Sequence, residues 1–130
     1  MTKDAALYEF FNNAISGVTA YPETSVPSKA NGDSEDAALP YLTYTNPDAG
    51  FGEEVSLTVN LWFPPNVGEA VPNAAARALY EKLGDGGAIV HYDGGAFWLK
   101  RGTPFSQPVP LDSSNIKRRY INITEEKLSP

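Results

Sequence analysis

The chain has 130 residues, enough for one domain with a sizeable core, and it contains no cysteine. The lack of cysteine excludes disulfide bonds, thiol catalysis and cysteine-ligated zinc, and no apolar run approaches the ~20 residues that a membrane span needs. The net charge of −6 is unevenly distributed: residues 1–54 hold nine acidic and two basic residues, and residues 55–130 hold seven acidic and eight basic ones. This asymmetry suits either head-to-tail packing of identical subunits or one exposed acidic loop.

The first predicted element is a helix that begins after Thr2 and ends near Ser16 and Gly17. Thr2 is a suitable N-cap, and Asp4 complements the positive end of a helix. Apolar residues follow at helical spacing and predict a core-facing stripe of Leu7, Phe10, Phe11, Ala14 and Ile15.

A short strand at Val18–Tyr21 is followed by a long polar loop at about residues 22–38. A loop of this length is usually functional or disordered, and contact with neighbouring subunits is one way to hold it. Its acidic group, Asp33, Glu35 and Asp36, lacks the spacing of a calcium loop. We therefore expect solvated acidic surface here in preference to a metal site.

The clearest pattern lies at Val55–Phe63, after a strand at Leu39–Thr45 and a turn at residues 46–50. Apolar residues alternate there with Ser56, Thr58, Asn60 and Trp62, which predicts a strand with one face on a core. The second face carries no charge, whereas strands that face solvent usually carry Lys or Glu. We expect this neutral face to meet a neighbouring subunit or the chain's own long loop.

A second helix is predicted at Glu69–Leu83, with Pro72 in its first turn and Gly84 at its end. Its expected inward side is Val71, Ala75, Ala78, Leu79 and Leu83. The glycines of residues 84–87 run from helix to strand, the reverse of a phosphate loop, so they indicate a helix C-cap.

Asp93-Gly94 between apolar runs at 89–92 and 96–99 predicts a hairpin that places Val90 opposite Phe97 and Ile89 opposite Trp98. Residues Gly102–Asn115 are rich in proline and serine and are predicted to form a loop. A last strand at Arg118–Glu125 has Ile121 and Ile123 inward and repeats the neutral outward design with Tyr120, Asn122 and Thr124.

The predicted order is therefore α-β-β-β-α-β-β-β, in one domain spanning residues 1–130. It indicates an α+β fold with two helices packed on one face of a mostly antiparallel sheet.

No residue pattern predicts a catalytic, cofactor or metal site. His91 is the only histidine and lies two residues before Asp93, but no nucleophile turn accompanies them, so a structural or surface role is expected. The basic cluster Lys117, Arg118 and Arg119 is expected to pair with acidic patches of a neighbouring subunit in preference to nucleic-acid phosphates.

Five blocks of sequence resemble a family of minor structural proteins of long-tailed phages and prophages. The blocks are Tyr21–Pro27, Leu39–Tyr44, Glu54–Trp62, Asp93–Pro104 and Ile116–Thr124. Members lie in the head–tail joining region, and the element order is similar to that of tail terminator or tail-completion proteins.

The resemblance implies a virion protein made in the host bacterial cytoplasm, with no cofactor and no membrane. It implies a homo-oligomeric ring, expected to be a hexamer, that ends tube polymerisation and contacts the tail tube protein and the head connector, with DNA passing through the lumen. The expected contact residues are Ser56, Thr58, Asn60, Trp62, Tyr120, Asn122, Thr124, Lys117, Arg118 and Arg119. A head-side adaptor or stopper is the alternative, and a small hydrolase or ligand-binding domain using His91 and Asp93 is the remote one.

Overall fold

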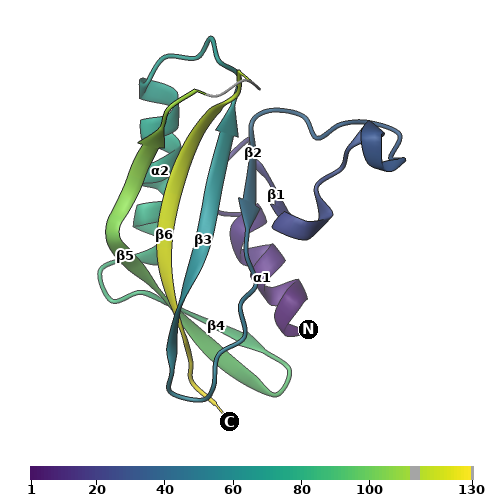
Figure 1. Cartoon of the computed structure of the whole chain (residues 1–130). Helices are drawn as coiled ribbons and strands as arrows, with labels where there is room; N and C mark the ends of the chain where they lie inside the picture. Colours follow the sequence, from purple (N-terminus) through teal and green to yellow (C-terminus); the bar gives the residue numbers. More distant parts are fainter. Residues whose placement is uncertain (112–114, 130) are drawn as a thin grey trace.

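The computed structural model describes residues 1–111 and 115–129. In chain order the elements are α1 (Lys3–Asn12), β1 (Thr19–Pro22), β2 (Tyr41–Tyr44), β3 (Glu54–Phe63), α2 (Ala70–Leu83), β4 (Ala88–Tyr92), β5 (Gly95–Val109) and β6 (Lys117–Lys127), with 3₁₀ helices at Glu23–Ser25 and Lys29–Asn31. The six strands form one curled sheet in the order β1-β2-β3-β6-β5-β4 (Figure 1). β1 and β2 run parallel and the other neighbours run antiparallel. The predicted α+β class is confirmed.

Helix α1 begins as predicted but ends earlier. The Thr2 hydroxyl accepts a hydrogen bond from the backbone N–H of Ala5 at 3.1 Å, which is the expected N-cap. The helix ends at Asn12, whose side-chain oxygen accepts a hydrogen bond from Ala20 N–H at 3.0 Å. That bond fastens the end of the helix to β1, while Ile15 still reaches the core from the following turn.

One hydrophobic core joins the sheet to both helices. The alternation predicted for β3 is confirmed, since Leu57, Val59 and Leu61 are fully buried and the residues between them are not. The other large, fully buried side chains of this core include Leu7, Phe11, Phe63, Leu79, Leu83, Ile121 and Ile123. The inward position predicted for Val71 is wrong, because Val71 is 48% exposed while Pro72 and Ala76 face the core.

The hairpin of β4 and β5 has the predicted register, with Val90 opposite Phe97 and Ile89 opposite Trp98. The loop predicted at Gly102–Asn115 is wrong over its first half, because β5 continues to Val109 and pairs with β6 across a register shift between residues 101 and 106. The part of that predicted loop at residues 112–114 lies outside the described residues.

The continuation of β5 depends on two local features. Gly102 lies so close to β6 that a Cβ atom on it would be 2.6 Å from the carbonyl oxygen of Asn122. Pro104 and Pro108 fit in this half of the strand because β4 pairs only with residues 95–99. The second half of β5 therefore has one edge without a β4 partner, where a missing N–H costs no ladder bond.

Candidate interaction surface

The sheet face opposite the hydrophobic core gathers the neutral side chains that were predicted to meet another protein. We call it the outward face. On it, β3 and β6 place Ser56 opposite Thr124, Thr58 opposite Asn122, Asn60 opposite Tyr120, and Trp62 opposite Arg118. Apart from the exposed Ser56, these side chains are half-buried within the single chain.

A row of rings crosses the outward face from β1 to β3 and ends beside Arg118 on β6. The ring centroids of Tyr21 and Tyr41 are 5.9 Å apart, and those of Tyr41 and Trp62 are 6.1 Å apart in a stacked arrangement. The guanidinium of Arg118 lies 5.4 Å from the centroid of the Trp62 ring, within range of a cation–π interaction. The indole N–H of Trp62 donates to the Thr43 hydroxyl at 3.0 Å, which fixes the orientation of the ring.

Two polar atoms of the outward face are buried without a hydrogen-bond partner among the described residues. They are the side-chain oxygen of Asn60 and Nε of Arg118. Leaving a buried polar atom unsatisfied costs about 1–3 kcal/mol, so such atoms are uncommon in folded proteins.

The predicted basic cluster is divided between the two faces of β6. Lys117 and Arg119 point inward and form ion pairs with Glu69 at 2.9 and 3.2 Å, and Arg119 also donates to Asn73 at 2.7 Å. The hydrogen bond from Lys117 holds the pKa of Glu69 below its usual value. Arg118 alone of the three points outward, and it forms no ion pair within residues 1–111 and 115–129.

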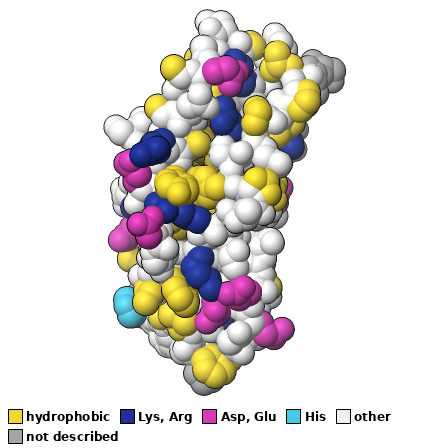
Figure 2. Space-filling view, turned by 90° about the vertical axis from the view of Figure 1, so that its left-hand side faces the viewer, with side chains coloured by type: hydrophobic (Ala, Val, Ile, Leu, Met, Phe, Trp, Pro, Cys, Tyr) yellow, Lys and Arg dark blue, Asp and Glu magenta, His cyan; other side chains and the backbone are white. Residues whose placement is uncertain are grey.

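Other bases are paired in a similar way near α2 and β5. Arg101 contacts the carboxylate of Asp85 at 2.6 Å, and Arg77 contacts that of Glu81 at 2.9 Å. In the side view of Figure 2, basic and acidic side chains accordingly lie next to each other and form no separate basic patch. This side of the molecule offers no continuous positive surface of the kind that binds a phosphate backbone.

Residues 22–38, predicted as a long polar loop, contain two 3₁₀ helices and form a projection that we call the arm (Figure 1). The backbone N–H of Ser28 donates to the Asp33 carboxylate at 2.9 Å, and that of Lys29 donates to Asp36 at 2.8 Å. These two hydrogen bonds hold the segment around the second 3₁₀ helix, Lys29–Asn31, against the residues that follow it. The third acidic residue, Glu35, is exposed and makes no side-chain hydrogen bond or ion pair with the described residues.

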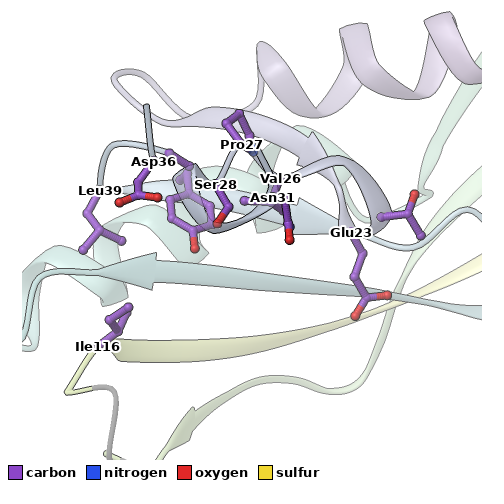
Figure 3. A pocket seen from close by; sticks show the side chains of 11 residues that line it. Glu23, Val26, Pro27, Ser28, Asn31, Asp36, Leu39 and Ile116 are labelled. Carbon is purple, nitrogen blue, oxygen red and sulfur yellow. The ribbon is translucent and has the colours of Figure 1, made fainter. Parts of the chain in front are cut away.

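Two depressions flank the row of rings. One, of about 450 Å³, lies between the arm and β2, with Glu23 at one end and Asp36, Leu39 and Ile116 at the other (Figure 3). The second, of about 650 Å³, lies on the outward face where β5 meets β6. We call it the groove, and its lining includes Pro104, Gln107, Val109, Arg118, Tyr120 and Asn122.

The side chains of His91 and Asp93 form no hydrogen bond or ion pair with each other, so they do not make a catalytic dyad. His91 is an exposed residue of β4, and the Asp93 carboxylate contacts the amino group of Met1 at 2.9 Å. Nowhere in residues 1–111 and 115–129 do three or more His, Asp or Glu side chains gather in a way that could hold a metal ion.

None of the helices in the described ranges is long and apolar enough to cross a membrane. The functional evidence is thus the geometry of the outward face, the arm and the groove. Comparison of the chain with protein-family models, with curated proteins and with solved structures finds no match.

Proposed function

We propose that the protein is a structural subunit that assembles into a ring at the head-proximal end of a phage tail. In this role it ends polymerisation of the tail tube and provides a docking surface for the head connector. The observation that carries the proposal is the outward face, a large polar and aromatic surface that includes two unsatisfied buried atoms. In the proposed arrangement both helices cover the core face of the sheet, so the outward face is free for a partner.

The central part of the outward face, away from the charged group of Glu54, Lys100 and Glu126 at one end, has the composition of a protein–protein interface. Interface centres are depleted of charged residues and enriched in tyrosine, tryptophan and arginine. The row of Tyr21, Tyr41, Trp62 and Arg118 fits this description, and its ring contacts hold the side chains before any partner arrives. A surface that is already ordered loses less conformational entropy when it binds.

The edges of the sheet are poorly suited to pairing with a strand of another subunit. Subunits are therefore more suited to assemble through the faces of their sheets. β1 has only four residues and ends at Pro22. The second half of β5, which lacks a β4 partner, contains Pro104 and Pro108. Short edge strands and edge prolines are devices that prevent uncontrolled sheet extension. A closed ring with a fixed number of subunits requires this restriction.

The net charge of −6 also suits a ring through which DNA passes. Acidic groups that line a lumen repel phosphates and let the duplex slide. Because most bases near β5 and α2 are paired with acids, little free positive charge opposes this effect.

The experiment is sedimentation velocity over a range of concentrations, together with negative-stain imaging. We expect one closed oligomer, a hexamer, and its loss in Thr58→Arg, which places a charge in the middle of the outward face. Ala74→Arg, at an exposed position of α2, is the matched control and should assemble normally. A chain that stays monomeric at high concentration and is absent from the virion would contradict the proposal. Binding to the tail tube protein would favour a terminator, and binding to the connector alone would favour a head-side adaptor.

A further inference from the structure

The arm and the groove are complementary in charge and lie on either side of the row of rings. We propose that the arm of one subunit lies in the groove of the next, with Glu35 paired to Arg118. This inference rests on the proposed ring and identifies the surfaces that join its subunits.

The groove supplies a half-buried cation that forms no ion pair with residues 1–111 and 115–129. Arg118 lies against the ring of Trp62, and its Nε is buried and unpartnered among the described residues. Its neighbours in the cluster, Lys117 and Arg119, point to the other face and share one carboxylate there, that of Glu69. A carboxylate that enters the groove would therefore meet one uncompensated positive charge, and ion pairs of arginine with carboxylate are among the stronger polar contacts.

The arm supplies the matching anion. Asp33 and Asp36 are used within the arm, where each accepts a backbone N–H, so their carboxylates hold its shape. Glu35 lies between them in the sequence and is exposed. The arm as a whole carries four acidic residues and one lysine. It is thus a preformed acidic projection. Two of its exposed carboxylates, those of Glu23 and Glu35, make no hydrogen bond or ion pair with the described residues, and Glu35 is the one that follows the second 3₁₀ helix.

The topology sets the direction of the contact. The arm follows β1, at one end of the strand order, and the groove lies between β6 and β5, towards the other end. A contact between two different surfaces of identical subunits is heterologous, and it closes into a ring when the rotation between neighbours allows it. One arm and one groove per subunit would then leave no unpaired surface in a closed ring.

Charge exchange tests the pairing. Glu35→Lys and Arg118→Glu should each weaken self-association by about tenfold or more, because each leaves like charges facing each other. The double variant Glu35→Lys/Arg118→Glu restores opposite charges in every contact and should recover association. Glu9→Lys, the same charge change at an exposed position of α1, is the matched control and should have no effect.

The absence of cysteine from the natural chain allows a direct geometric test. Ser34 and Gln107 are exposed residues of the arm and of the groove. Under mild oxidation, Ser34→Cys mixed with Gln107→Cys should give a disulfide-linked dimer, and a chain with both substitutions should give a ladder of multimers. Ser34→Cys/Ala74→Cys is the control pair and should not give the ladder.

The outcomes separate this inference from the proposed function. The ladder together with recovery in the charge-exchanged variant supports the inference. If the cysteine variants form rings but no disulfide, or if Glu35→Lys does not weaken ring assembly, the arm–groove contact is overturned. The proposed ring itself is not contradicted by either result. A monomer in solution that is also absent from virions overturns both.

Discussion

Asn60 provides the sharpest test of the outward face, because its side-chain oxygen is buried without a hydrogen-bond partner among the described residues. It lies in the middle of the sheet, between Thr43 on β2 and Tyr120 on β6. An unsatisfied buried carbonyl costs about 1–3 kcal/mol. Asn60→Val removes that carbonyl, and its branched side chain suits a strand. We expect the free energy of unfolding of the isolated subunit to rise by about 1 kcal/mol, equivalent to a melting temperature about 3–5 °C higher.

The assay is urea unfolding of the subunit below its association concentration, followed by tryptophan fluorescence. Thr58→Val, at the next outward position of β3, is the matched control, because its hydroxyl is not among the unsatisfied atoms. Its unfolding free energy should change by less than about 0.5 kcal/mol. A loss of stability in the isolated Asn60→Val subunit would show that the amide is already satisfied there, and the reasoning would be wrong.

Three further predictions concern the fold. Gly102→Ala should lower the free energy of unfolding by about 2 kcal/mol, because the new methyl meets the backbone of Asn122, whereas Gly68→Ala has free space and should be neutral in the same melt. Burial raises the pKa of Glu125 above its ordinary value of 4.5, so the folded state holds the proton of this carboxyl more tightly than the unfolded state does. The free energy of unfolding should therefore fall as pH rises from 4.5 through the raised pKa. Glu125→Gln should remove that loss, and urea titrations at pH 7 should show the variant to be the more stable protein. Burial raises the pKa of Tyr44 to about 12, so stability should fall between pH 10 and 12, and less steeply in Tyr44→Phe; equal slopes would contradict this.

The elements predicted well are those specified by short-range patterns. The alternation of β3 fixes which residues are buried, and the Asp93-Gly94 turn fixes the register of the hairpin. Both signals are local, so a single sequence is sufficient to read them. The same holds for the phase of β6, in which Ile121 and Ile123 face the core.

The elements predicted poorly depend on neighbours that are distant in the sequence. β5 extends to Val109 despite two prolines because β4 is too short to pair with its second half. Likewise, the inward direction of Lys117 and Arg119 follows from the phase of Ile121, but their partner Glu69 lies about fifty residues away. An inward base is acceptable only when such a partner exists, and the sequence alone does not reveal it.

We propose that the protein is a structural subunit at the head-proximal end of a phage tail. Gold-labelled antibody against the chain, imaged on virions induced from the strain that carries the gene, tests it most directly. We expect label at the junction of head and tail, at one site per particle. Particles without label at that junction, in a preparation where the antibody detects the purified protein, would contradict it.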